Sequence, residues 1–168
     1  QGLALDQVLF VPSARPPHKS PDGIVDPEHR YQMAKLAVAD NPYFFVSRIE
    51  INRKGPSYAI QTIQDLKNHY GPRCELSWII GSDSLIEFKI WKDYDRLLDM
   101  CQFVAINPPE YPLSEVPPDI MKRVKIFKIP FMQIAATDIR KHIRSGQSIR
   151  YLVPLAVVDY IQHHKLYH

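Results

Sequence analysis

The sequence predicts an α/β protein whose 168 residues form a single domain around a doubly wound parallel sheet. Strand-like apolar or β-branched runs alternate along the chain with segments of helical spacing, which is typical of such a sheet. The length suits one domain with a substantial core and is too short for two ordinary ones. The expected strands are 7–11, 43–51, 76–80, 103–106 and 124–129.

Capping residues and helix breakers place the helices between these strands. Asp26-Pro27 is an N-cap followed by proline at the first helical position. Ser57 can cap the next helix, which Gly71-Pro72 ends. Gly146 suits the C′ position after a later helix. The expected helices are 27–40, 58–70, a short one around 97–98, 137–145 and 154–163.

Composition indicates a globular protein, which we expect to be cytoplasmic. Hydrophobic residues make up 45% and charged residues 23%, and no apolar run approaches the ~18 residues of a membrane helix. The net charge of +3 suits an anionic substrate and is too small for a nucleic-acid binder. Cys74 and Cys101 are expected to be buried thiols in a reducing compartment.

Three polar loops follow expected strands. They are Arg15–Lys19, Gly81–Asp83 and Ile134–Arg140. Ligands of doubly wound sheets bind beyond the carboxyl ends of the strands, so we expect the three loops to converge on one site.

The first of these loops has the chemistry of a phosphate site. Arg15, His18 and Lys19 supply three cations within five residues, and the intervening prolines lower the entropy lost on binding. A solvated surface loop is an equally supported interpretation of this segment alone.

Thr137 begins a stretch that suits an anion. As an N-cap it would start a helix whose free N–H groups attract negative charge. Arg140 and Lys141 would then stand in the first turn, where their charges oppose the helix dipole unless an anion is bound. Asp138 offers ordinary capping as the alternative.

The remaining candidates carry weaker signals. Gly81 allows close backbone approach, and Asp83 can accept hydrogen bonds from ribose hydroxyls or cap the following helix. Trp91 and Lys92 can offer an aromatic face and a cation, although core packing is the commoner role of tryptophan. His163 and His164 are adjacent and do not share a helix face, so we expect no metal site.

Taken together and in order, six segments resemble the bacterial nicotinate mononucleotide adenylyltransferases, and the resemblance runs from Val8 to Tyr167. Each segment is weak alone, but the set is highly specific. The segments are Pro16–Lys19, Gly55–Tyr58, Ile80–Leu85, Trp91-Lys92, Ile134–Arg140 and Ile149–Pro154.

The resemblance implies a Rossmann-like nucleotidyltransferase fold that uses ATP with Mg²⁺. It implies transfer of AMP to nicotinate mononucleotide, which gives nicotinate adenine dinucleotide and pyrophosphate in NAD biosynthesis. It implies no nucleic-acid or membrane partner, and leaves a homo-oligomer open. The resemblance assigns His18, Lys19, Thr137 and Arg140 to the ATP phosphates, Gly81 and Asp83 to the adenosine ribose, and Ala59, Trp91 and Lys92 to nicotinate mononucleotide.

Three departures from the family pattern bear on these assignments. The family's first strand and catalytic His-x-Gly-His loop are missing from this sequence, so no catalytic residue is assigned. We expect that about 30 residues, the strand, turn and helix of a βαβ unit, have been omitted. Ala135 and Ala136 stand where serines are frequent, and Ala59 stands where threonine is frequent.

Two alternative functions remain open on the sequence alone. One is a related adenylyl- or cytidylyltransferase that acts on another phosphorylated substrate, such as phosphopantetheine. The other is a catalytically inactive nucleotide-binding module, which the missing histidine loop would explain.

Overall fold

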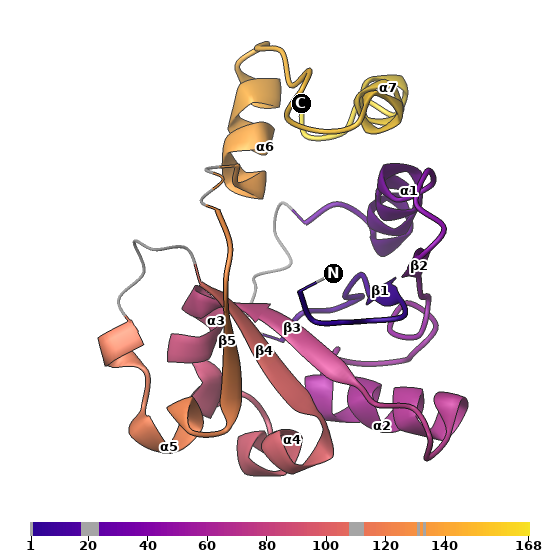
Figure 1. Cartoon of the computed structure of the whole chain (residues 1–168). Helices are drawn as coiled ribbons and strands as arrows, with labels where there is room; N and C mark the ends of the chain where they lie inside the picture. The colour runs from indigo at the N-terminus through magenta and orange to yellow at the C-terminus, as the bar shows by residue number, and fades with distance from the viewer. Residues whose placement is uncertain (1, 18–23, 108–112, 131, 133) are drawn as a thin grey trace. The chain divides into compact units, whose positions relative to one another are not determined.

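The structure is a computed structural model that describes residues 2–17, 24–107, 113–130, 132 and 134–168 (Figure 1). The chain forms two compact units. Residues 1–57 and 133–168 make the first unit, and residues 58–132 make the second. The elements are β1 (Val8–Phe10), α1 (Pro27–Ala37), β2 (Phe44–Val46), α2 (Ala59–Tyr70), β3 (Ser77–Gly81), α3 (Ser82–Ile86), the 3-10 helix η1 (Phe88–Ile90), α4 (Tyr94–Met100), β4 (Gln102–Asn107), the 3-10 helix η2 (Leu113–Glu115), α5 (Pro118–Met121), β5 (Val124–Lys128), α6 (Ala136–Arg144) and α7 (Leu155–His163).

The five strands among the described residues all pair in parallel. In the first unit β1 pairs with β2, and in the second unit the order is β3-β4-β5 (Figure 1). The predicted α/β class, with parallel strands and interleaved helices, is therefore confirmed. Hydrogen bonding gathers the strands into two sheets, one in each unit. That residues 1–168 make a single domain stays a prediction.

Each unit has its own hydrophobic core. In the second unit the sheet and its helices bury Ile60, Ile63, Ile80, Leu85, Phe88, Leu97, Phe103, Ala105, Val116, Ile120 and Val124. In the first unit α6, α7 and the turn between them bury Ile143, Ile149, Val157, Val158, Ile161 and Leu166, against which residues of α1 pack. Most of these side chains are apolar positions of the predicted elements. Six lie outside them, in or beside short helices and turns that the sequence pattern did not predict: Leu85, Phe88, Val116, Ile120, Ile149 and Leu166.

Three of the predicted helix ends are confirmed. Asp26 Oδ1 accepts a hydrogen bond from the Glu28 N–H at 2.8 Å, at the start of α1. Gly71 takes φ +80° after α2, where its N–H donates to the Lys67 carbonyl. Gly146 takes φ +67° after α6, and two hydrogen bonds back to α6 complete a Schellman motif there.

Two expectations about length and burial were wrong. The strand predicted over 43–51 is only three residues long, because β2 can pair only as far as the equally short β1. The chain then turns, and the Asn52 N–H donates to the Arg48 carbonyl. Cys74 and Cys101 are free thiols that are half-buried rather than buried. Burial raises the pKa of Cys101 to about 11.

Among the described residues, no helix is both long enough and apolar enough to cross a membrane.

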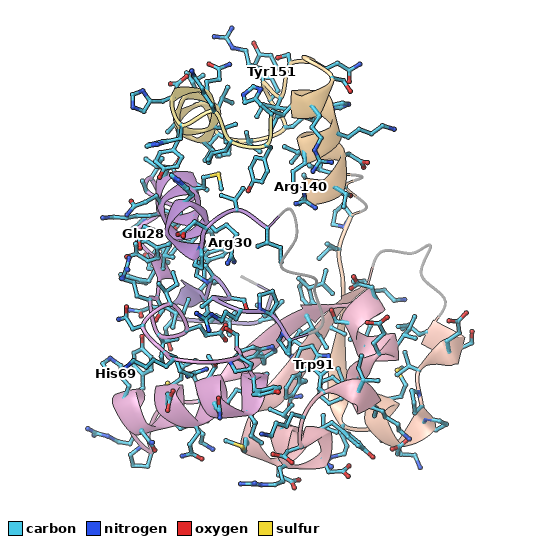
Figure 2. The ribbon with its side chains drawn as sticks, turned by 180° about the vertical axis from the view of Figure 1, so that it is seen from behind. Glu28, Arg30, His69, Trp91, Arg140 and Tyr151 are labelled. Atoms are coloured by element: carbon cyan, nitrogen blue, oxygen red, sulfur yellow. The ribbon has the colours of Figure 1, made fainter. Side chains whose placement is uncertain are left out.

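A bidentate ion pair ties α1 to the turn after β2. Glu28 lies on α1 (Figure 2). Arg48 donates to both of its carboxylate oxygens, at 2.9 and 2.8 Å, and Gln32 donates to Glu28 Oε1 at 3.0 Å. The Arg48 and Gln32 hydrogen bonds lower the pKa of Glu28 to about 2. The folded protein therefore favours the ionised form of this carboxylate more strongly than the unfolded chain does.

Glu28→Gln should reduce the loss of stability in acid. Because the pKa of Glu28 is depressed in the folded state, its contribution is complete above about pH 4.5 and disappears as the pH falls toward 2. Urea unfolding between pH 7 and pH 2.5 should show a shallower decline for the variant. Arg48→Gln should also make the fall in unfolding free energy with decreasing pH shallower. If both variants lose stability as steeply as the wild type, the ion pair does not make this contribution.

Candidate functional site

Trp91 stands directly after η1 in the second unit and is half-buried. Its ring lies 5.2 Å from the ring of Phe88, at an interplanar angle of 29°, so the two are stacked. Phe88 is fully buried in the core. Trp91 is thus a packing residue on the Phe88 side, and the sequence-based expectation of a core role is met in part.

Lys92 and Ala59 lie beside a common neighbour. The Lys92 ammonium lies 4.6 Å from the ring centroid of Tyr58, the N-cap residue of α2, and Ala59 is the first residue of that helix. The cap makes no side-chain hydrogen bond to the helix. Lys92 thus lies against the side chain of the residue that precedes Ala59 in the chain, and Trp91 precedes Lys92.

Asp83 occupies the exit of β3, the first strand of the second unit's sheet. Gly81 is the last residue of β3, and Asp83 lies in the first turn of α3. The Asp83 carboxylate folds back over Gly81, where an added Cβ would overlap Asp83 Oδ1. The same oxygen accepts a hydrogen bond from the Ser84 N–H at 2.8 Å. Gly81 thus leaves room for an exposed carboxylate at the strand end. That these residues bind a ribose stays a prediction.

Thr137 and Arg140 lie on α6 in the first unit, but not where the sequence placed them. Helix α6 begins at Ala136, with Ala135 as the N-cap, so Thr137 is not the capping residue. The chain is already helical one residue before Thr137, and Asp138 takes the acidic place in the first turn. Arg140 is then the fifth helical residue, and Lys141 belongs to the last turn. The prediction that Arg140 and Lys141 stand in the first turn and oppose the helix dipole was therefore wrong.

The start of α6 still has the character of an anion site. Alanine at the N-cap offers no side-chain hydrogen bond, so the first N–H groups are left without a capping side chain. Arg140 lies close enough to Tyr167 to act on it electrostatically, as does Arg30. Burial nevertheless raises the pKa of Tyr167, so its hydroxyl is neutral at physiological pH.

The first basic loop is only partly visible. Arg15 is described and exposed, whereas His18 and Lys19 lie outside the described residues. Ser57, which we expected to cap α2, instead accepts hydrogen bonds through Oγ from the N–H groups of Ala14 and Arg15, both at 3.1 Å. The capping prediction failed because the hydroxyl is used by a segment more than 40 residues away in sequence.

Arg30 is a residue that the sequence analysis missed. It lies at the start of α1 (Figure 2). Its guanidinium donates to the carbonyls of Val25, Ser13 and Ala14. The sequence shows only an arginine near a helix start, because backbone carbonyls as partners leave no side-chain pattern.

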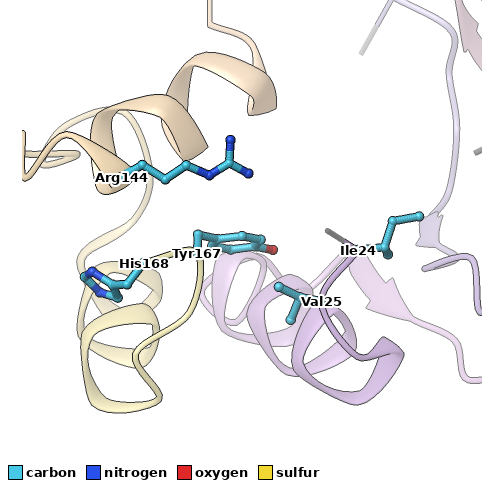
Figure 3. A pocket seen from close by; sticks show the side chains of 5 residues that line it. All are labelled: Ile24, Val25, Arg144, Tyr167 and His168. Atoms are coloured by element: carbon cyan, nitrogen blue, oxygen red, sulfur yellow. The ribbon is translucent and has the colours of Figure 1, made fainter. Parts of the chain in front are cut away.

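A small cavity of about 260 Å³ is found within the first unit (Figure 3). It is lined by Ile24, Val25, Arg144, Tyr167 and His168. None of these was predicted as a site residue, and the volume is below the roughly 300–1,000 Å³ of most ligand pockets. The cavity is therefore not our candidate site.

The described part of the chain contains no cluster of three or more His, Cys, Asp or Glu residues suited to a metal. His163 and His164 are exposed and contact each other through their rings, as do Tyr160 and His164.

Known nucleotidyltransferases are similar to this chain over most of its length. A family model described as Cytidylyltransferase-like matches residues 1–150. A curated relative from Moorella thermoacetica, named "Probable nicotinate-nucleotide adenylyltransferase", is 42% identical and aligns with 98% of this chain and 79% of its own length. A relative of the same name from Thermus thermophilus is 44% identical, over 98% of this chain and 85% of its own length.

Solved structures share the fold. A Plasmodium falciparum nicotinic acid mononucleotide adenylyltransferase complexed with NaAD superposes with a TM-score of 0.75 at 17% identity, over 97% of this chain and 83% of that one. The same enzyme complexed with APC gives a TM-score of 0.72 at 15% identity. With its fold shared and nearly its whole length aligned at above 40% identity, the chain belongs to the nicotinate-nucleotide adenylyltransferase family of nucleotidyltransferases.

Proposed function

We propose that this protein transfers the adenylyl group of ATP to nicotinate mononucleotide, giving nicotinate adenine dinucleotide and pyrophosphate for NAD biosynthesis. The observation that carries the proposal is the alignment of 98% of the chain with relatives named for this activity, at 42–44% identity. The arrangement of Ala59, Trp91 and Lys92 supports the nicotinate end, because an aromatic ring lies next in sequence to a cation.

The reaction needs alignment more than acid–base chemistry. An oxygen of the mononucleotide phosphate, already an anion, forms a bond to the α-phosphorus of ATP. The bond from that phosphorus to the bridging oxygen breaks, and pyrophosphate leaves with the electron pair. Rate enhancement then comes from holding two phosphates in line and from stabilising the charge that builds on the leaving group.

We assign the ATP phosphates to His18, Lys19, Thr137 and Arg140. The uncapped start of α6 supports this assignment, since its N–H groups and the Thr137 hydroxyl are suitable donors to phosphate oxygens. Arg140, one turn further along, adds a permanent positive charge. Backbone N–H groups take the place of the serine hydroxyls that Ala135 and Ala136 do not supply.

We assign the adenosine ribose to Gly81 and Asp83, and the pyridine ring to Trp91. A carboxylate at a strand end can accept hydrogen bonds from both ribose hydroxyls. Phe88 covers one face of Trp91, and we place the pyridine on the other face. Lys92 and the first N–H groups of α2 at Ala59 then attract the nicotinate carboxylate, which favours nicotinate over nicotinamide mononucleotide.

We propose that Mg²⁺ enters with ATP. Mg²⁺ is usually held by substrate phosphates, waters and one or two carboxylates rather than by a protein cage. Since the exposed Asp83 is assigned to the ribose, the ATP phosphates and waters would hold the metal. When bound, the metal would neutralise phosphate charge. The free thiols Cys74 and Cys101 suit a reducing cytoplasm, where we place the protein.

Pyrophosphate release should be faster with nicotinate mononucleotide than with nicotinamide mononucleotide, and Lys92→Gln should narrow that preference. The variant removes a cation next to the proposed carboxylate site, so kcat/KM should fall for nicotinate mononucleotide alone. Lys89→Gln is the matched control, because Lys89 pairs with Asp119 at 3.3 Å instead. Wild-type protein that releases no pyrophosphate with either mononucleotide would refute the proposed function.

Gly81→Ala should weaken ATP binding by displacing the Asp83 carboxylate that an added Cβ would overlap. A hydrogen bond to a charged group contributes about 1.5–3 kcal/mol, so we expect a loss of about 10- to 100-fold in ATP affinity. Binding of inorganic pyrophosphate should be unchanged. In an Asp83→Ala background the glycine change should add little. Additive losses in calorimetric titrations would show that Gly81 acts independently of Asp83.

Trp91→Leu should weaken binding of nicotinate mononucleotide while leaving ATP binding intact. Leucine keeps an apolar contact with Phe88 but removes the aromatic face, and stacking of a base on an aromatic ring contributes about 1–3 kcal/mol. Trp78→Leu is the control, since Trp78 packs against the same core. If both variants lose stability equally and bind the mononucleotide like wild type, Trp91 has only a packing role.

A further inference from the structure

Lys92 lies between two residues whose conformations are fixed. On one side, the Trp91 ring stacks on the buried Phe88, and the Trp91 N–H donates to the Phe88 carbonyl at 3.0 Å. On the other side, Asp93 has a left-handed backbone, with φ +54° and ψ +41°, and its carbonyl accepts from the Leu97 N–H at 3.1 Å. Such a backbone is uncommon for a residue with a Cβ, so the surrounding structure has to hold it there. The backbone of Lys92 is therefore held on both sides.

Tyr58, which faces the Lys92 ammonium, is also held in place. Its carbonyl accepts hydrogen bonds from the N–H groups of Gln61 and Thr62, at 3.1 and 3.2 Å, and from the Thr62 hydroxyl at 3.3 Å. Its side chain makes no capping hydrogen bond to α2 and packs instead against the hydrophobic core of the second unit. The position of the ring is thus set by α2 and by the core.

The contact between the two side chains is a cation–π interaction. The Lys92 ammonium lies 4.6 Å from the centroid of the Tyr58 ring, and the negative face of an aromatic ring attracts a cation at this distance. Lys92 is exposed, and its long side chain would otherwise sample many rotamers, so the ring reduces its freedom.

The chemistry of this contact leaves the charge of Lys92 available to a ligand. The Tyr58 ring is uncharged, so it holds the ammonium without neutralising it, as a carboxylate would. An ammonium has three N–H donors, more than one ring engages, so it can also donate to a second partner. Tyr58 and Trp91 pack against the same buried core, which places the held cation and the aromatic face of Trp91 in one part of the second unit.

We propose that Tyr58 is a positioning residue for the choice of mononucleotide: it holds the Lys92 ammonium for the carboxylate of a nicotinate ring stacked on Trp91. The proposal rests on the proposed function, which places that ring and its carboxylate. A cation that is already held loses less entropy on binding, so the carboxylate is bound more tightly. The amide of nicotinamide is neutral and gains little from the same charge. Tyr58 therefore acts through Lys92 and favours nicotinate mononucleotide.

Tyr58→Leu tests this proposal, with Tyr58→Phe and Tyr70→Leu as controls. Leucine keeps an apolar contact with the core but removes the ring, so Kd and KM for nicotinate mononucleotide should rise about two- to fivefold, as loss of an exposed cation–π contact predicts. The same constants for nicotinamide mononucleotide, and kcat, should not change. Phenylalanine keeps the ring and should behave like wild type. Tyr70 ends the same helix, where its ring contacts His69, and Tyr70→Leu should change neither affinity.

A second replacement separates the charge distribution of the ring from its packing. Pentafluorophenylalanine in place of Tyr58 keeps an aromatic ring against the core, but its fluorines withdraw electron density from the ring face that attracts the cation. It should weaken binding of nicotinate mononucleotide selectively, also in the case that Tyr58→Leu does not fold. In a Lys92→Met background, neither change at position 58 should alter the affinities further, because the cation is gone.

Calorimetric titrations with both mononucleotides, thermal melts and pyrophosphate release separate this proposal from the proposed function. A wild-type preference that survives in both ring replacements would overturn the proposal alone. An equal loss for both mononucleotides with a lower Tm would also overturn it, since Tyr58 would then be a purely structural residue. Wild-type protein that binds both mononucleotides equally would overturn it and leave adenylyl transfer intact. Wild-type protein that binds nicotinate mononucleotide selectively but releases no pyrophosphate from ATP would refute the proposed function, and the titrations would still decide the role of Tyr58.

Discussion

Parallel strand pairing is the constraint on which the rest of this structure depends. Within a parallel sheet every strand runs in the same direction, so all chain exits after the strands lie at one edge. In the second unit this puts Gly81 and Asp83 at the carboxyl end of β3, where a glycine can sit under a carboxylate. In the first unit it puts the Ser13–Arg15 segment just past β1, within reach of α1. Connections must return along helices, and the helix starts supply the uncapped N–H groups proposed to bind anions.

The sequence predicted best those features that depend on residues close together in the chain. The Asp26 cap and the glycines at 71 and 146 follow from local geometry, because a short polar side chain or a positive φ is needed at that point of the chain. Ser57 has the same local chemistry as Asp26 but a different role, since its hydroxyl is used by Ala14 and Arg15. Whether the Ser57 hydroxyl caps its own helix or bonds another segment depends on which backbone packs beside it in the folded protein.

The same distinction between local and distant partners applies to the candidate site. Gly81 and Asp83 could be placed from the sequence because the strand end and the glycine are adjacent to the carboxylate. Arg30 could not, because the carbonyls it binds lie at residues 13, 14 and 25, and nothing in their sequence marks them as its partners. Trp91 shows a third case, in which one side chain both packs on Phe88 and is proposed to bind the pyridine. Sequence patterns predict either role but not their coexistence.

The separate cores bear on how the protein fluctuates. Among the described residues, the buried cluster of the first unit has fewer members than that of the second and draws mainly on α6, α7 and the turn between them. The free energy of local unfolding is lower where few apolar contacts are buried. Backbone amides of the first unit should therefore exchange their hydrogens with solvent more readily, through local unfolding. Helix α6, which we assign to the triphosphate, belongs to this less stable unit. A ligand that binds only the folded form of α6 would slow this exchange by mass action. The protection of α6 amides would then report how much of the protein has ligand bound.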